Sequence, residues 1–171
     1  MPVPATLIDL FNLYRVELLH IASAVLALAI AFRGAAPERW LIGVFIATMI
    51  LPVYGARWLN IGNLPFGPYS WAYVGIDLLA TAGFVAIALN ANRNYPLWVA
   101  GFQLVAVGAH AVRVLGEMVS PFAYMVLAVS PSYCQLVLIG AGFIRHRQRE
   151  KRFGSYREWR VMRGQARLFH R

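Results

Sequence analysis

Several polar and ionisable residues interrupt stretches of this sequence that are otherwise apolar. Carboxylates, imidazoles and guanidinium groups are costly inside a lipid bilayer, so each one found there is a candidate functional residue. Together they can bind a proton, hold a cofactor or bond neighbouring helices to one another. The candidate polar layer consists of Glu17, His20, Asp77, Gln103, His110, Arg113 and Glu117.

The spacing of four of these residues predicts that they share one face of a helix. Gln103, His110 and Glu117 repeat every seven residues, and Arg113 follows His110 by three. Positions three, four and seven apart lie on the same side of an α-helix. We expect this polar stripe to face the interior of a helical bundle, because exposing it to lipid would be costly.

Three kinds of chemistry fit these residues. His20 and His110 could hold a b-type haem between two helices, with Arg113 pairing a haem propionate. Asp77 placed between two histidines could instead form a proton or ion relay. The third possibility is structural, with the carboxylates paired to arginines and neutral histidines packed inside the bundle. The close ligand spacing typical of a zinc or iron site is missing, so no metal site is predicted.

The composition indicates a protein embedded in lipid. The chain has 171 residues, of which 60% are hydrophobic and 13% charged, and its mean hydropathy is +0.58. A soluble domain is about 45–50% apolar and about 25% charged. These values exclude a disordered chain and argue against a soluble enzyme. The single cysteine, Cys134, excludes an intrachain disulfide framework.

Five apolar stretches are long enough to cross a membrane as helices. They predict an all-α, five-span transmembrane domain over residues 1–144, with an interfacial segment at residues 5–15 before the first span. Pro52 and Pro131 fall inside the second and fifth stretches, and each predicts a kink. The stretches cover roughly residues 16–32, 40–56, 71–89, 97–116 and 121–144.

The distribution of basic residues predicts the orientation. The net charge is +9, and residues 145–171 hold ten basic and two acidic side chains, so nearly all of the excess lies there. Basic residues concentrate on the cytoplasmic side of membrane proteins, which predicts an outer N-terminus and a cytoplasmic C-terminus. Fifteen of the sixteen basic residues are arginine. We interpret that bias as a GC-rich bacterial genome and expect the bacterial inner membrane.

Residues 145–171 are predicted to form a basic amphipathic tail on the cytoplasmic side. Aromatic and apolar residues recur between the arginines, which favours contact with the anionic lipids of the inner leaflet. No nucleic-acid partner is expected. The residues assigned to the membrane surface are Arg145, Arg147, Arg149, Lys151, Arg152 and Trp159.

The sequence contains no catalytic motif of high specificity, so we expect a protein without enzymatic activity. Its small size and its many small residues favour a structural or accessory subunit that packs against itself or a larger membrane complex. The alternatives are a b-type haem redox protein that uses His20 and His110, and a proton- or ion-handling protein centred on Asp77. The identity of any cofactor is left open.

Overall fold

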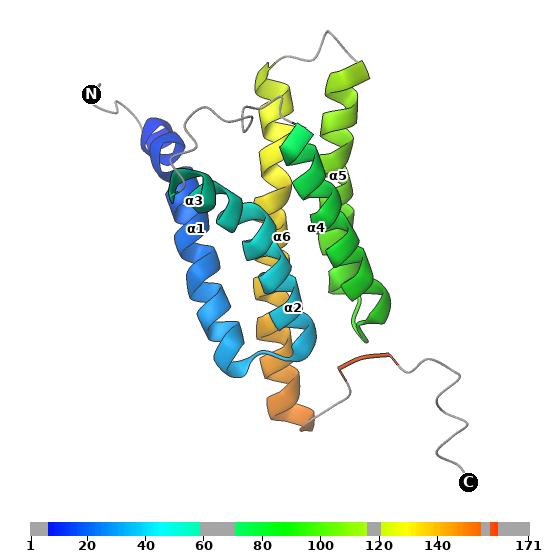
Figure 1. Ribbon diagram of the computed structural model, residues 1–171. Helices are drawn as coiled ribbons and strands as arrows, with labels where there is room; N and C mark the ends of the chain where they lie inside the picture. Colours follow the sequence, from blue (N-terminus) through cyan, green and yellow to red (C-terminus); the bar gives the residue numbers. More distant parts are fainter. Residues whose placement is uncertain (1–6, 59–70, 116–120, 155–157, 161–171) are drawn as a thin grey trace.

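The computed structural model describes residues 7–58, 71–115, 121–154 and 158–160 (Figure 1). Over these residues the protein is all-helical, as the sequence predicts, with one isolated β-bridge and no strand. The elements are α1 (Leu7–Arg33), α2 (Ala36–Phe45), the π-helix η1 (Ile46–Ile50), α3 (Leu51–Trp58), α4 (Trp71–Asn90), α5 (Tyr95–Leu115) and α6 (Pro121–Phe153).

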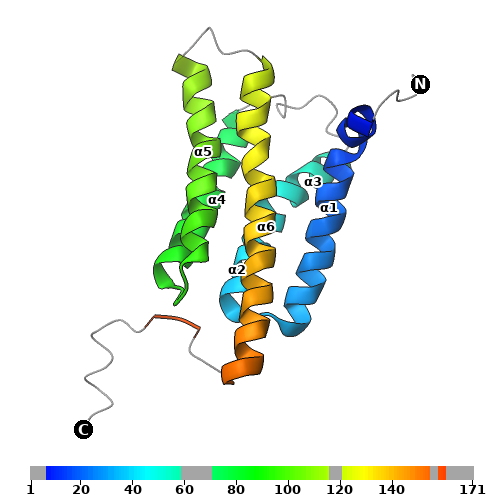
Figure 2. The same ribbon diagram turned by 180° about the vertical axis from the view of Figure 1, so that it is seen from behind.

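The long helices lie side by side, and α6 runs between the two halves of the bundle (Figures 1 and 2). On one side α6 packs extensively against α5, which in turn packs against α4. On the other side α6 contacts α1 and α2. α2 also contacts α4, so the α1–α2 half and the α4–α5 half touch each other directly as well as through α6. In the view of Figure 1 this contact lies in front of α6.

The kink predicted at Pro52 takes the form of a π-helix. Proline has no backbone N–H, and its ring clashes with the carbonyl four residues earlier, here that of Thr48. The widened turn at Ile46–Ile50 ends two residues before the proline, and the Leu51 N–H bonds the carbonyl of Ile46 five residues back. A single widened turn is a known way for a helix to absorb such a conflict. Pro131 differs, because α6 continues through it without interruption.

The last helix is longer than the sequence pattern predicts. α6 extends to Phe153, beyond the expected end of the fifth stretch at residue 144. Residues 145–153 contain neither glycine nor proline, and Arg147 donates to Glu150 one turn further along. The helix ends at Gly154, whose positive φ is one that residues with a side chain rarely adopt. The first part of the predicted tail is therefore continuous with α6.

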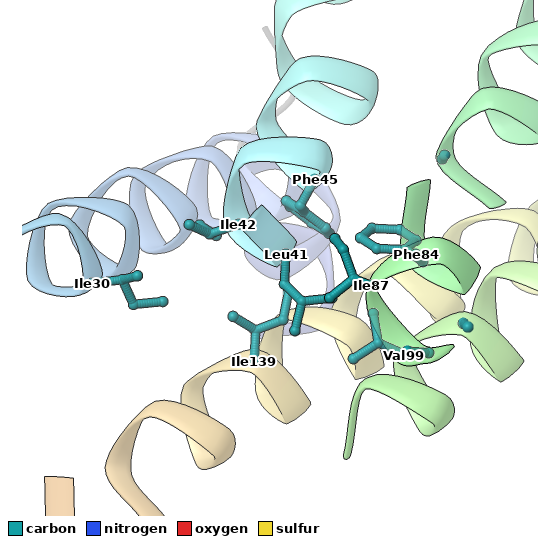
Figure 3. Packing of buried hydrophobic residues seen from close by; sticks show 11 residues of the cluster. Ile30, Leu41, Ile42, Phe45, Phe84, Ile87, Val99 and Ile139 are labelled. Carbon is teal, nitrogen blue, oxygen red and sulfur yellow. The ribbon is translucent and has the colours of Figure 1, made fainter. Parts of the chain in front are cut away.

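A compact apolar core forms where α2, α4, α5 and α6 meet (Figure 3). Leu41, Phe45, Phe84, Val99 and Ile139 are all fully buried there. Ile30 extends the same cluster toward α1. This core fixes the relative positions of the helices that carry the polar residues.

Large apolar side chains also cover the outside of the described helices. They include Ile21, Val25 and Phe32 on α1, Trp40 on α2, Leu79 and Leu89 on α4, Leu104 and Val112 on α5, and Val137 and Ile144 on α6. Within the described residues, two helical stretches are long and apolar enough to cross a membrane: Ala36–Gly55, which runs through α2, η1 and most of α3, and Tyr95–Val112 in α5. The apolar stretch Val74–Asn90 in α4 is shorter.

Residues 158–160 cross the end of the bundle after α6. Trp159 forms the isolated antiparallel bridge with Ala91, and its side chain packs against the core. The Asn92 N–H bonds the Glu158 carbonyl, and the Arg160 N–H bonds the Asn90 carbonyl. The sequence assigns Trp159 to the membrane surface, whereas in the structure it is half-buried against the protein.

Candidate functional site

Asp77 on α4 is the centre of a hydrogen-bonded chain that crosses three helices. Its Oδ2 lies 2.7 Å from Nε2 of His110, and its Oδ1 accepts from Nε2 of Gln103 at 2.8 Å. His110 and Gln103 lie seven residues apart on α5, at the spacing of the predicted polar stripe. The structure therefore brings these three members of the predicted polar layer together.

Gln135 on α6 continues this chain. Its side-chain amide donates to Oε1 of Gln103 at 2.8 Å and to the carbonyl of Val99 at 3.3 Å. Both glutamines are almost completely buried. We call the four residues Asp77, Gln103, His110 and Gln135 the buried polar chain.

The Asp77–His110 pair is the part of the buried polar chain that can exchange a proton. The side chains of His110 and Asp77 are only 12% and 16% exposed. A carboxylate and an imidazole at this distance can share one proton, while the amide of Gln103 fixes the carboxylate orientation. The same contacts also bond α4, α5 and α6 together, and polar contacts of this kind contribute about 0.6 kcal/mol each on average in lipid.

His20 belongs to a different cluster from His110. Its Nδ1 lies 3.2 Å from the Tyr54 hydroxyl, so this contact joins α1 to α3. His110 directs Nε2 to Asp77. A haem bound through Nε2 of His110 would have to displace the Asp77 contact, and this arrangement adds no support to the haem hypothesis.

The remaining members of the predicted layer lie elsewhere. Glu17 is exposed on α1. Arg113 is part of α5, but its side chain lies outside the described residues, as does the whole of Glu117. Among the residues that the structure describes, no three His, Cys, Asp or Glu side chains gather into a group that could hold a metal ion.

A second polar cluster, which sequence reasoning missed, lies at the end of the bundle that holds the α1–α2 and α4–α5 connections. Glu38 is completely buried in the first turn of α2, where its negative charge interacts favourably with the helix dipole. Its Oε1 accepts from the guanidinium of Arg93, and from the hydroxyl of Tyr95 at 2.9 Å. Arg93 Nη2 lies 3.2 Å from Nδ1 of His146 on α6. We call Glu38, Arg93, Tyr95 and His146 the end cluster.

The end cluster lowers the pKa of His146. Burial lowers the pKa of His146 below its ordinary value of 6.5, and the positive charge of Arg93 lowers it further. Arg147 acts in the same direction, whereas Glu150 and Glu158 oppose the shift. An imidazole nitrogen that accepts a hydrogen bond from a guanidinium cannot also bind a proton.

A carboxylate from the segment after α6 completes this end of the molecule. Oε2 of Glu158 accepts from the backbone N–H of Ala36 at 3.0 Å. That N–H is one of the four at the start of α2 that have no partner within the helix.

One sequence signal could have indicated this end cluster. Glu38, Arg93 and the tail all belong to connections that the predicted topology places on the same side.

No protein-family model, no curated protein and no solved structure matches this chain.

Proposed function

We propose that this protein is a five-span accessory subunit of the bacterial inner membrane, with its N-terminus outside and its C-terminus in the cytoplasm. In this proposal it packs laterally against a second copy of itself or against a larger membrane complex. The observation that carries the proposal is that the bundle is apolar on its outside and polar in its interior, the reverse of a water-soluble protein. Large apolar side chains cover the outside, while Asp77, Gln103 and Gln135 are turned inward.

The distribution of charge supports the proposed orientation. Arg33 and Arg39 flank the α1–α2 connection, Arg93 lies between α4 and α5, and the basic end of α6 follows residue 144. The Glu38–Arg93 and Glu158–Ala36 bonds join these connections at one end of the bundle. Positive charge gathered at one end is the pattern of a cytoplasmic face.

One face of α5 supports lateral packing. Gly101, Leu104, Val105, Gly108 and Val112 follow one another at helical spacing on this face. Leu104, Val105 and Val112 are about half exposed, and a Cβ added at either glycine would meet no atom within 4 Å. Small residues on an outer helix face let another helix approach closely.

Enlarging this face tests the accessory role. The double variant Gly101→Leu/Gly108→Leu should keep its thermal stability in detergent, because both positions are open. It should lose a cross-link formed in membranes through Val105→Cys in a Cys134→Ala background, because the larger side chains hold a second helix away. A photoreactive residue at position 105 replaces the cysteine when the partner is another protein.

The matched control is Gly43→Leu, which enlarges an equally open glycine on α2. It should leave the cross-link intact. An unchanged cross-link in the α5 double variant would contradict the accessory proposal. So would the absence of any cross-link in the protein that keeps Gly101 and Gly108.

The buried polar chain supports a second candidate function, the movement of protons across the membrane. The chain runs from His110 through Asp77 and Gln103 to Gln135, which bonds the Val99 carbonyl. Val99 lies one helical turn from Tyr95, a member of the end cluster whose hydroxyl donates to Glu38. His110 and Tyr95 are separated by about 22 Å along α5, most of the thickness of a hydrocarbon core of about 30 Å.

Proton flux into proteoliposomes loaded with a pH-sensitive dye tests this second candidate. Asp77→Asn should reduce the flux at least about tenfold while the fold is retained, because asparagine still accepts from Gln103 but cannot bind the proton. Thr81→Val is the control, since the Thr81 hydroxyl bonds the Asp77 backbone carbonyl and not its carboxylate. Equal fluxes for the wild type and Asp77→Asn would rule out a relay through Asp77.

A further inference from the structure

A cavity of about 490 Å³ opens beside the end cluster, between the start of α5 and the last turns of α6. It is bordered by residues of the α4–α5 connection and by one face of α6. The side chains that matter for its chemistry are Arg93, Tyr95, Trp98, Leu138, Arg145 and Arg149.

The part of this cavity nearest the end of α6 is basic. Arg145 and Arg149 lie one turn apart on α6 and are exposed, and Arg93 enters from the α4–α5 connection. Glu38 balances the charge of Arg93, but none of the described residues that line the cavity is acidic. The start of α5 adds the positive end of its helix dipole.

The opposite part of the cavity is apolar. Leu138 and Ala141 precede Arg145 on the same face of α6, and the indole of Trp98 lies across from them on α5. Leu138 and Arg149 are separated by about 16 Å along the helix axis. Over that length the lining changes from hydrocarbon to guanidinium.

We propose that this cavity binds an anionic phospholipid, with the lipid phosphate between Arg145 and Arg149 and the start of an acyl chain along Leu138, Ala141 and Trp98. Guanidinium groups bind phosphate oxygens through paired hydrogen bonds. Basic pockets between helices on the cytoplasmic side of a membrane suit lipid headgroups of this kind. The inference rests on the proposed function, because it requires this end of the bundle to lie in the inner leaflet.

The site is distinct from general attraction between a basic tail and the membrane surface. Arg147 bonds Glu150, and Lys151 and Arg152 are exposed on the same helix, yet none of these three basic residues lines the cavity. A discrete site therefore predicts that Arg145 and Arg149 matter much more than Lys151 and Arg152.

Native mass spectrometry of the full chain in mild detergent measures this difference. Dioleoyl phosphatidylglycerol is the anionic probe, and dioleoyl phosphatidylcholine is the zwitterionic probe with the same chains. The wild type should bind one phosphatidylglycerol at least about tenfold more tightly than phosphatidylcholine. Arg145→Gln/Arg149→Gln should abolish that preference. Lys151→Gln/Arg152→Gln removes the same charge from the same helix and should change the affinity less than about threefold.

Two results would overturn the lipid site. One is an equal loss of affinity in the two double variants, which would indicate attraction by overall charge. The other is thermal stabilisation by millimolar inorganic phosphate that depends on Arg145 and Arg149 and equals that by phosphatidylglycerol, which would indicate a site for a small soluble anion.

Vesicle flotation separates this proposal from the proposed function. Failure of the chain to float with vesicles made of phosphatidylcholine alone would refute the five-span proposal and the lipid site together. Flotation without any preference for phosphatidylglycerol in the binding measurement would refute the lipid site alone.

Discussion

At the scale of single residues, the buried carboxylate of Glu38 needs hydrogen-bond and charge partners to offset its loss of hydration. Glu38 is fully buried, and its Oε1 depends on contacts with Arg93 and Tyr95. A buried ion pair is costly to break, because removing one partner leaves a charge without compensation. The Tyr95 hydroxyl donates a hydrogen bond to the same carboxylate, so a change that displaces Tyr95 removes that bond and should weaken the end cluster.

The ring of Tyr95 occupies the space that a side chain at Gly142 would need. A Cβ at residue 142 would lie 2.6 Å from two ring carbons of Tyr95, and the ring is held by its bond to Glu38. Gly142→Ala should therefore destabilise the fold by about 1–2 kcal/mol, the cost of forcing a methyl group into a packed site. The measurement is the unfolding midpoint in detergent.

Gly140→Ala is the matched control two residues away on the same helix. Its Cβ would lie 3.8 Å from Leu26, at ordinary contact distance. Alanine is up to about 1 kcal/mol better than glycine inside a helix, so this variant should be neutral or slightly stabilising. A lower midpoint for Gly140→Ala than for Gly142→Ala would contradict the proposed role of Tyr95.

Sequence reasoning predicted part of the polar chemistry, for a definable reason. Gln103 and His110 are seven residues apart on one helix, and Asp77 is the only acidic residue of the neighbouring apolar stretch. Local spacing is enough to indicate such a pair. Glu38 and His146 instead meet through Arg93, which is distant from both along the chain. No local pattern specifies that meeting.

At the scale of elements, the apolar stretches of the sequence predict where helices form, but they do not predict how far the last helix extends. The apolar stretches indicated the helical segments, and Pro52 indicated the disturbance before α3. The sequence pattern placed the end of the last helix at residue 144, where apolar residues give way to charged ones. The helix nevertheless continues to Phe153, because charged residues such as arginine and lysine are good helix formers. Only Gly154 ends it.

The length of α6 has a consequence for its position relative to a bilayer. A helix that runs from Pro121 to Phe153 is much longer than a membrane span requires. At a rise of about 1.5 Å per residue it extends for about 50 Å, against a hydrocarbon core of about 30 Å. If α6 spans as proposed, about 20 Å of its length lies outside the hydrocarbon core. The proposed lipid site requires Arg145 and Arg149 to lie in that outer part.

At the scale of the whole molecule, His146 makes the stability of the fold depend on pH. Its pKa is lowered in the folded state, so the unfolded chain binds a proton more readily. The stability contribution is complete above the ordinary pKa of 6.5 and is lost as the pH falls through the lower folded pKa. Between about pH 7.5 and about pH 5, the unfolding midpoint in detergent should fall.

His146→Gln isolates this contribution, because glutamine can accept from Arg93 and does not titrate. The decrease in midpoint on acidification should be smaller in this variant than in the wild type. Identical pH profiles for the two proteins would show that another group is responsible for the acid sensitivity.

The bond between Glu158 and the first N–H of α2 also sets an order of events during synthesis. The two residues are 122 positions apart. At about 5–20 residues per second, a ribosome needs roughly 6–24 s to add the residues between them. Through that interval the segments of α3 to α6 are made while the start of α2 lacks the Glu158 carboxylate. The closing of this end of the bundle is therefore a late event of biogenesis, and a nascent chain arrested before residue 158 would contain the sequence of α1 to α6 without the carboxylate that bonds the first N–H of α2.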